Sequence, residues 1–411
     1  MTGQTAGSVP RIRFKGFDAA WEPKKLGQIY TERNERGNDS LPILSVSIHS
    51  GISNGELSTE TLGKKVRRSE DKSLYKHVHS GDLVLNMMRA WQGALGVAQI
   101  EGMVSPAYLT AAPDDTVYPL FMDCGLRRPQ VVAQMNKLSY GVTDFRKRLY
   151  WDSFVRVKFD APSVSEQQRI TSYFSELSSL ISLHQCKYHK LVALKKAMLQ
   201  RMFPRADAAI PELRFKGFSD DWVIERLGQI GRTQSGIGFP EAEQGGKVGT
   251  PFFKISDMSL LGNENEMLVA NNYVSDVQLR RRRWVPIGDV PAVIFAKVGA
   301  ALMLNRKRMV RAPFLIDNNA MAYIFDSTWD EDFGKALFDT IYLPKYAQVG
   351  ALPSYNGSDI EGITVHRPKY KQEQEKIGAY FKQLDALVSK HATQLQKLKQ
   401  IESAFMEEMF A

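Results

Sequence analysis

Clusters of arginine and lysine, several with tryptophan or tyrosine beside them, are the part of this sequence best suited to bind a ligand. The clusters are GKKVRRS at 63–69, MMRAWQG at 87–93, DFRKRLYW at 144–151, QLRRRRW at 278–284, FAKVG at 295–299 and NRKRMVR at 305–311. Cationic side chains contact phosphates, and arginine or lysine in a groove donates hydrogen bonds to base edges. We therefore predict DNA contacts at Lys64, Lys65, Arg67, Arg68, Arg89, Trp91, Arg146, Arg148, Arg280, Arg281, Arg282, Arg283, Lys297, Arg306, Lys307 and Arg308.

Each cluster also has a plainer interpretation, which is a solvated charged face. Arg89 and Trp91 in particular are equally suited to a structural role. The run Arg280–Arg283 fits a solvated face least well, because four like charges repel one another unless a polyanion compensates them. The chain carries 54 Lys and Arg against 45 Asp and Glu, a net charge of +9, which favours a polyanionic partner without requiring one.

Catalytic motifs are absent from the sequence. The segment GGKVGT at 245–250 has glycines and a lysine but lacks the spacing of a phosphate-binding P-loop, and there is no HExxH metalloprotease motif. His77 and His79 alternate on an expected strand without a third ligand near them in the sequence, so we expect no metal site and no cofactor in this chain. Any chemistry would then come from another subunit.

The chain repeats itself at two places. Residues 10–29 and 211–230 align without gaps and share eleven of twenty positions, including the phrase RFKGF and a tryptophan four residues later. Residues 166–203 and 373–410 share fourteen of thirty-eight positions. The segments between these repeats, about 30–160 and 231–367, show almost no similarity. A repeated frame with different contents indicates two interchangeable cassettes, each with its own specificity, on one scaffold.

The second repeat is expected to form long helices. Apolar residues recur at steps of three and four, as in the seam of a coiled coil. At about 1.5 Å per residue each helix would be on the order of 57 Å long, and two such stripes most simply bury each other as an antiparallel pair. The predicted interface residues are Ile170, Phe174, Leu177, His184, Leu191, Ile377, Phe381, Leu384, His391 and Leu398. His184 and His391 lie at the two helix midpoints, and we expect them to form a polar layer that fixes register rather than a metal site.

The 411 residues exceed a single hydrophobic core, and the predicted organisation has four parts. These are a first recognition domain at 1–160, a central spacer helix at 161–205, a second recognition domain at 206–367 and a C-terminal spacer helix at 368–411. Short strands, glycine turns and helices predict mixed α/β (α+β) domains with a pseudo-two-fold internal repeat. Two cysteines, Cys124 and Cys186, are too few for a disulfide framework, so a reduced cytosolic compartment is expected. No apolar run is long enough to predict a membrane span.

The sequence resembles the DNA-specificity subunits of type I restriction–modification systems over essentially its whole length. The resemblance is carried by the repeated P-x-[IL]-R-F-K-G-F-x-x-x-W entry followed by LGQI, by NMMRAWQGALG at 86–96 and SPAY at 105–108, and by the exit into a long helix at 162–177 and 368–384. Each motif is weak by itself, but their order, found twice, is specific.

The resemblance implies a cytoplasmic protein of a bacterium or archaeon, without catalytic residues of its own. Each cassette would be a target recognition domain that reads one half of a bipartite sequence in double-stranded DNA, and the two helices would set the distance between the half-sites. The scaffold would dock two modification subunits, which bring S-adenosylmethionine, and in some systems ATP-dependent restriction subunits. An alternative is a scaffold whose two cassettes bind proteins. A self-contained enzyme would need a methyl-donor or nuclease motif, and the sequence contains neither.

Overall fold

The computed structural model describes residues 9–48, 51–54, 72–143, 146–205, 208–348 and 352–410. The chain divides into two compact units, one formed by Met1–Ile181 with Lys397–Ala411 and the other by Ser182–Gln396. Two helices of 39 residues, α6 (Val164–Met202) and α11 (Lys371–Met409), each contribute to both units. No helix in these described ranges is long and apolar enough to cross a membrane.

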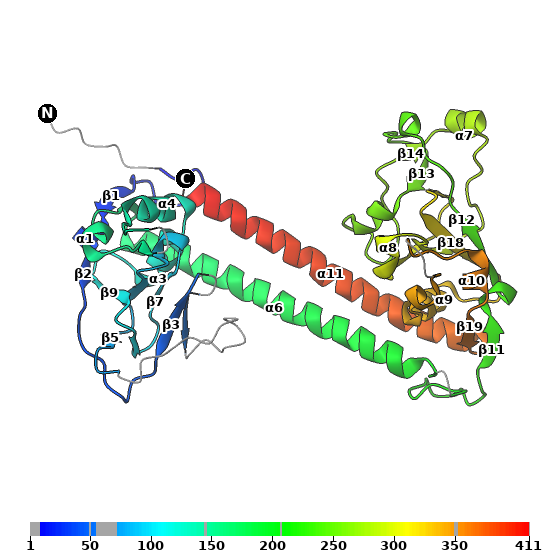
Figure 1. Ribbon diagram of the computed structural model, residues 1–411, viewed down its shortest axis with the longest axis horizontal. Coiled ribbons are helices and arrows are strands. Elements are labelled where there is room, and N and C mark those ends of the chain that lie inside the picture. Colours follow the sequence, from blue (N-terminus) through cyan, green and yellow to red (C-terminus); the bar gives the residue numbers. More distant parts are fainter. Residues whose placement is uncertain are drawn as a thin grey trace. The chain divides into compact units, whose positions relative to one another are not determined.

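The first unit is built on a four-stranded antiparallel sheet in the order β2-β9-β6-β7, together with three two-stranded pairs, β1-β10, β3-β4 and β5-β8 (Figure 1). Its strands are β1 (Glu22–Lys25), β2 (Tyr30–Glu32), β3 (Leu44–Ser47), β4 (Gly51–Asn54), β5 (Lys76–Val78), β6 (Leu83–Asn86), β7 (Leu95–Val97), β8 (Gly102–Val104), β9 (Tyr108–Pro113) and β10 (Lys158–Ala161). Its short helices are α1 (Leu26–Ile29), η1 (Ala90–Gln92), α3 (Pro119–Leu126), α4 (Pro129–Leu138) and α5 (Trp151–Phe154).

The second unit has a four-stranded sheet in the order β12-β18-β15-β16, a three-stranded sheet β14-β13-β17 and the pair β11-β19. Its strands are β11 (Val223–Arg226), β12 (Gly231–Ser235), β13 (Thr250–Phe253), β14 (Tyr273–Val274), β15 (Ala292–Ala296), β16 (Lys307–Val310), β17 (Leu315–Ile316), β18 (Ala320–Phe325) and β19 (Thr364–Arg367). Its short helices are η3 (Leu227–Gln229), η4 (Glu241–Glu243), η5 (Ile255–Ser259), α7 (Asp276–Arg282), α8 (Ala300–Met303), α9 (Glu331–Thr340), η6 (Leu343–Tyr346) and α10 (Gly357–Glu361).

The repeated RFKGF phrase docks each domain on the first turn of a long helix. In the first unit Arg13 donates two hydrogen bonds to Glu166, at 2.7 and 2.6 Å, and in the second unit Arg214 does the same to Glu373, at 2.6 and 2.8 Å. Both carboxylates are buried. The glycine of the phrase has a left-handed backbone, with φ of 97° at Gly16, a conformation that favours glycine.

A glutamine beside each buried glutamate completes the attachment. The side chain of Gln167 accepts a hydrogen bond from the backbone N–H of Tyr118, 2.7 Å away, which immediately precedes α3. Gln374 accepts one from Asp330, the residue before α9, at 3.0 Å. At the start of each long helix, the glutamate therefore holds the RFKGF segment and the glutamine next to it holds one helix of the domain.

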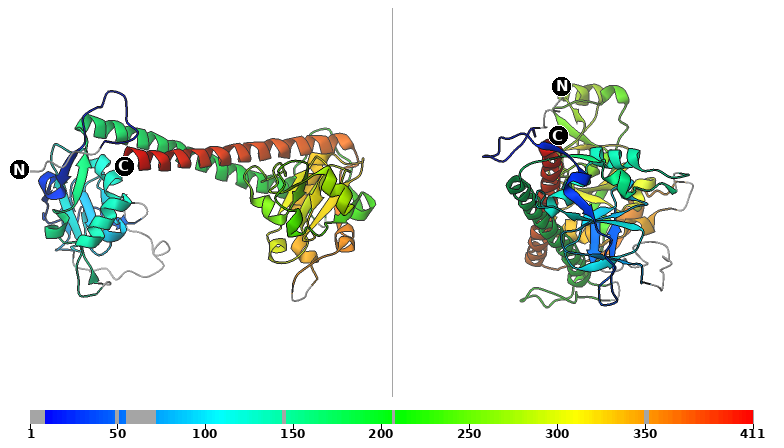
Figure 2. Two further views of the ribbon diagram at one scale, coloured as in Figure 1. Left: turned by 90° about the horizontal axis from the view of Figure 1, so that it is seen from above. Right: turned by 90° about the vertical axis from the view of Figure 1, so that its left-hand side faces the viewer.

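The long helices run antiparallel within each unit, where they lie side by side (Figure 1 and Figure 2). In the first unit Ser178 contacts Glu402, while Phe174 stacks with Phe410 farther along. In the second unit His184 contacts His391, and Lys195 contacts Asp385. The partner's number falls as the residue number rises in both units, as an antiparallel pair requires. The predicted fold class, with two mixed domains and two long antiparallel helices, is confirmed.

The predicted helix seam is buried most deeply where the domains also cover it. Ile170 and Phe174 belong to the core of the first domain, and Ile377, Phe381 and Leu384 belong to the core of the second. Leu177 is also buried, whereas His184, Leu191, His391 and Leu398 are half-buried. The predicted seam residues outside the two domain cores are therefore half-buried, with the exception of Leu177.

Candidate nucleic-acid interface

Two neighbouring loops present the basic residues of the first domain. Arg89 and Trp91 lie on the turn that follows β6, and Arg146 and Arg148 lie on the loop before α5. The backbone N–H of Leu149 donates to the carbonyl of Met87 at 2.9 Å, so the two loops lie side by side. Arg89, Arg146 and Arg148 are exposed, and none of them pairs with a carboxylate among the described residues.

Trp91 has a structural contact on the same turn. Its ring N–H donates to the carbonyl of Met88 at 2.9 Å, and the ring is half-buried. Gly93 ends the turn with a left-handed backbone, φ 86°. The turn is thus held in shape by Trp91 and presents Arg89. The other predicted residues of this domain, Lys64, Lys65, Arg67 and Arg68, lie outside the described residues.

Four consecutive arginines lie at the end of helix α7 of the second domain, the first three in its last turn and Arg283 as the residue that caps it. Arg281 and Arg282 bind the carboxylate of Glu243, at 2.7 and 2.8 Å, while Arg280 and Arg283 pair with no carboxylate in the described ranges. Hydrogen bonds from Gln278 and Arg282 lower the pKa of Glu243 to about 2. One buried carboxylate therefore compensates part of the like-charge repulsion that the sequence predicted, and the four side chains remain exposed.

The third basic cluster of the second domain is divided by burial. Arg306 is exposed and donates to the Ser259 hydroxyl at 2.8 Å. Lys307 is only 3% exposed and donates to the Ile341 carbonyl at 2.6 Å, and burial lowers its pKa to about 8. Arg308 is half-buried, and its guanidinium donates to the backbone carbonyls of Lys307 and Met258. The structure gives Lys307 an internal role, which argues against the predicted contact with DNA.

Lys297 lines a polar recess that sequence reasoning missed. The recess has a volume of about 390 Å³ and is lined by Lys297, Val298, Asn318, Asn319, Gln348, Ser354, Tyr355 and Asn356. Gln348 and Asn356 are engaged with Asp359, whereas Asn318 is exposed at the rim. Amide side chains can pair with both polar atoms of an adenine edge. The two consecutive asparagines that follow β17, Asn318 and Asn319, are the feature of the sequence that could have indicated this recess.

Solved structures with the same fold identify the architecture. Neither a protein-family model nor a curated protein sequence matches the chain. The S subunit of the type I restriction–modification system from M. genitalium superimposes with a TM-score of 0.63 at 12% identity, over 98% of this chain and 99% of that one. A chain from a structure concerned with complex assembly and conformational transition of the type I R-M system has a TM-score of 0.50 at 16% identity, over 96% and 98% of the two chains.

This chain has the fold of a type I restriction–modification S subunit. The match spans both domains and both long helices, and it confirms the architecture expected from the resemblance. Because the identity is low, the comparison bears on the fold and not on individual side chains. The side-chain contacts that hold the domains on the helices must therefore be taken from this structure itself.

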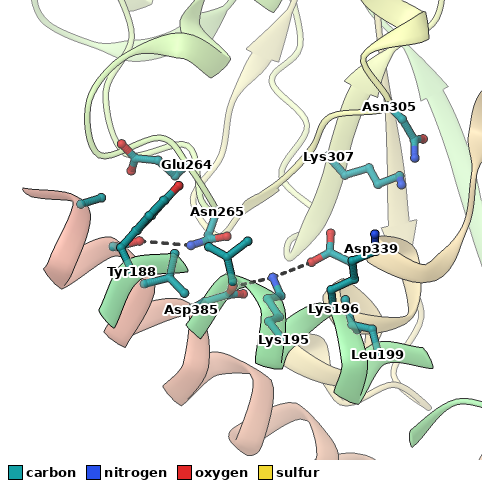
Figure 3. Close-up of a pocket in the computed structure, with 14 residues that line it drawn as sticks. Tyr188, Lys195, Lys196, Leu199, Glu264, Asn265, Asn305, Lys307, Asp339 and Asp385 are labelled. Carbon is teal, nitrogen blue, oxygen red and sulfur yellow. Dashed lines mark hydrogen bonds and ion pairs between the residues drawn. The ribbon is translucent and has the colours of Figure 1, made fainter. Parts of the chain in front are cut away.

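A network of half-buried charges holds the second domain of this S-subunit fold on the helix pair (Figure 3). Lys195 of α6 lies between Asp339 of α9, at 3.0 Å, and Asp385 of α11. Burial lowers the pKa of Lys195, but the two carboxylates outweigh burial and the pKa is raised overall. Burial raises the pKa of Asp339, but Lys335 and Lys195 outweigh it and lower that pKa to about 2. The network borders a cavity of about 410 Å³ that also contacts Lys307.

The two midpoint histidines contact each other. The Nδ1 atoms of His184 and His391 are 2.9 Å apart, and the ring centroids are separated by 5.0 Å. Burial, together with the nearby His184 and Lys187, lowers the pKa of His391. A short contact between two ring nitrogens requires one to donate and the other to accept, so the accepting nitrogen carries no proton. A polar layer that sets helix register remains a prediction for this pair.

The structure adds a neighbour to His77 and His79 that their sequence spacing does not show, while the expectation of no metal site there stays untested. Glu35, forty-two residues earlier than His77, places a carboxylate against both rings and is a candidate third ligand. Sequence reasoning missed it because Glu35 reaches β5 through strand pairing and not through local spacing.

Proposed function

We propose that this chain is a non-catalytic DNA-specificity subunit of a type I restriction–modification complex. The observation that carries the proposal is the full-length S-subunit fold, matched over 98% of the chain. The repeated frame with two different domains supports it, because one scaffold can then present two independent readers. The net charge of +9 and the exposed arginines of both domains suit a polyanionic duplex.

The proposed contacts in the first domain come from the two adjacent loops. Arg89, Arg146 and Arg148 are exposed and pair with no carboxylate among the described residues, so binding DNA would break no ion pair within that part of the chain. In the second domain we assign phosphate contacts to Arg280, Arg283 and Arg306, and base-edge reading to the recess that contains Lys297 and Asn318. Arginine suits phosphate because its guanidinium can donate two parallel hydrogen bonds to phosphate oxygens, and asparagine suits a base edge because its amide can form two hydrogen bonds to adenine. Lys307 is left out because it is buried.

The two long helices would serve as the spacer and as the docking site for two modification subunits that carry S-adenosylmethionine. Both helices expose large apolar side chains, which a two-helix pair without a partner would leave in water. Exposed examples are Leu180 at 46%, Leu183 at 47%, Leu194 at 40%, Leu387 at 43% and Ile401 at 40%. Contact with further subunits would remove this apolar surface from water and stabilise the assembly. Restriction subunits with ATP-dependent activity would complete a nuclease complex.

Mapping of adenine methylation in the host genome, with and without this gene, tests the proposal. The expected result is loss of methylation at one split motif, made of two short half-sites around a fixed gap. Unchanged methylation while a partner methylase is expressed would contradict the proposal. The alternative, a scaffold that binds proteins through its two domains, predicts no steep decrease of DNA affinity with salt, whereas phosphate neutralisation produces one.

A further inference from the structure

A cluster of two histidines and two glutamates lies on the first domain, outside the basic loops. Strand pairing brings its members together from three segments. The backbones of Arg36 and Lys76 form an isolated antiparallel β-bridge, and the backbone N–H of His77 donates to the carbonyl of Glu35 at 2.8 Å. On its other side, His77 on β5 pairs with Met103 on β8. Glu101 lies in the turn before β8 and accepts a hydrogen bond from the N–H of Ser80. Backbone contacts thus place Glu35 beside His77, and the hydrogen bond from Ser80 holds the carboxylate of Glu101 near them.

The two imidazole rings are held face to face between the two carboxylates. His77 and His79 are two residues apart, so both project from the same side of the chain, and their ring centroids are 4.1 Å apart at an angle of 36°. One edge of the ring pair faces Glu35, with His77 Nδ1 at 3.2 Å and His79 Nε2 at 2.8 Å. The opposite edge faces Glu101, with His77 Nε2 at 2.7 Å and His79 Nδ1 at 3.2 Å.

This arrangement gives the two carboxylates different tasks. If Glu101 accepts an N–H from each ring, both histidines are fixed in the tautomer that turns a lone pair toward Glu35. A carboxylate behind a ligating histidine orients the ring and raises its basicity in metal sites. One ligand atom from each of Glu35, His77 and His79 lies within 4.8 Å of the other two, and the ring nitrogens that face Glu35 are His77 Nδ1 and His79 Nε2. Zinc bonds of about 2.0–2.2 Å would draw them together by a small side-chain movement.

We propose that Glu35, His77 and His79 form a binding site for a zinc-class divalent cation, with Glu101 as the positioning residue behind the rings. Two neutral imidazoles and a carboxylate are a common zinc set that leaves a fourth position for water. Solvent can reach that position, since Glu35 and His79 are 50% and 34% exposed. With neutral rings the two glutamates carry two negative charges. Among the described residues, Arg33 is the cation that contacts the cluster: it binds the buried Asp82 at 2.7 Å and lies 3.7 Å from an oxygen of Glu35, so a bound ion would compete with it for that carboxylate.

The bound ion would cross-link segments that are far apart in the sequence. Glu35 lies after β2, His77 lies on β5 and His79 directly after it, and Glu101 lies directly before β8. β5 and β8 form a separate two-stranded pair, which has few hydrogen-bonded neighbours to hold it. A cation at this position would stabilise the pair against the segment after β2, and it would do so whether or not the proposed DNA function is correct.

Zinc titration of the full-length chain, stripped of metal by a chelator, tests the proposal. Calorimetry with zinc chloride is expected to show one saturable site, and zinc is expected to raise the midpoint of thermal unfolding. Substitution with Co²⁺ should give a visible absorption band of a four-coordinate site. The His79→Asn and Glu35→Gln variants are expected to lose at least a hundredfold in affinity, and Glu101→Gln about 10–100-fold as a positioning residue.

His184→Asn is the matched control, because it removes a histidine from the helix pair and leaves the cluster intact. Its zinc affinity and Co²⁺ spectrum are expected to equal those of the parent protein. All four variants change half-buried or exposed side chains, and circular dichroism without metal verifies their folding. The proposal is overturned if the parent binds no zinc at 100-fold excess over protein, or if a His77→Asn/His79→Asn double variant binds as tightly as the parent. Either result would leave the cluster as a hydrogen-bonded network of histidines and glutamates without a metal.

Discussion

The two domains are attached to the long helices in the same way but are built and held differently beyond that attachment. Each has a bidentate Arg–Glu pair, Arg13–Glu166 or Arg214–Glu373, and a glutamine that binds the backbone before a domain helix. The strand pairs β1-β10 and β11-β19 are likewise both antiparallel. The arginine, glutamate and glutamine of these contacts are identical in the two repeats, whereas the strand pairs form through the backbone with different side chains, so the attachment is independent of what the domain carries.

The contacts that are not shared are specific to each domain. The second domain adds the Lys195 network, and α11 packs so closely on the start of α9 that a side chain at Gly378 would clash with the Asp330 carboxylate. The equivalent position of α6 is Thr171, which bonds its own helix backbone. In the first domain the guanidinium of Arg128 instead lies over the ring of Phe410, at 4.8 Å, and donates to its carbonyl. The difference indicates a common docking device with accessory contacts fitted to each domain.

The largest expected effect is loss of the shared attachment. Arg13→Ala and Arg214→Ala each leave a buried carboxylate, Glu166 or Glu373, without its partner, which costs about 3–5 kcal/mol. Urea unfolding of the two variants measures the cost. Equal losses of unfolding free energy would support the equivalence of the two attachments, and Arg→Lys at the same positions controls for loss of the bidentate geometry. A large loss at only one of the two positions would show that the two attachments are not equivalent.

Removal of the unshared network comes next. Lys195→Met leaves Asp339 with Lys335 and leaves Asp385 without its cation, so we expect a loss of about 3 kcal/mol, at the lower end for a broken buried pair. Hydrogen exchange should show faster opening of α9, while α3 in the first domain keeps its protection. If α3 and α9 lost the same amount of hydrogen-exchange protection, the network would not act on the second domain alone.

The same network predicts a pH dependence. The pKa of Asp339 is lowered to about 2 in the folded protein, so its contribution is complete above the ordinary aspartate pKa near 4 and is lost as the pH falls toward 2. The contribution is about 2 kcal/mol, from a difference of nearly two pKa units. Stability measured from pH 6 down to pH 2 should fall less steeply in Asp339→Asn than in the parent. Parallel curves for the two proteins would contradict the assignment.

The smallest expected effect is a difference between two kinds of arginine at the end of α7: Arg281 and Arg282, which bind Glu243, and Arg280 and Arg283, which pair with no carboxylate among the described residues. Arg280→Ala with Arg283→Ala should lower the slope of log affinity against log salt by about 0.9 for each phosphate that is no longer neutralised, in the complex assembled with its modification subunits. Arg281→Ala should lower the slope less, because its guanidinium already binds Glu243. Fluorescence anisotropy with a duplex at several salt concentrations measures both. An equal change in all variants would show that Glu243 does not decide which arginines contact DNA.

Much of the fold could be predicted because its signals are local or repeated. The three- and four-residue spacing of apolar positions predicts helices at 166–203 and 373–410, and the structure has them at Val164–Met202 and Lys371–Met409. The identical entry phrases predict two equivalent attachments. The role of Arg13 and Arg214 could not be assigned in the same way, because their partners are more than 150 residues away and no spacing rule connects them.

The sequence by itself determined the duplication, the two long helices, the mixed character of the domains and the positions of the basic clusters, since all of these depend on composition and short-range period. Only the tertiary structure decided which cations are free. It buries Lys307, pairs Arg281 and Arg282 with Glu243, and leaves Arg280 and Arg283 exposed. Strand pairing also brought Glu35 and Glu101 to His77 and His79. Burial and ion pairing depend on distances between segments remote in the sequence, and those distances exist only in the folded chain.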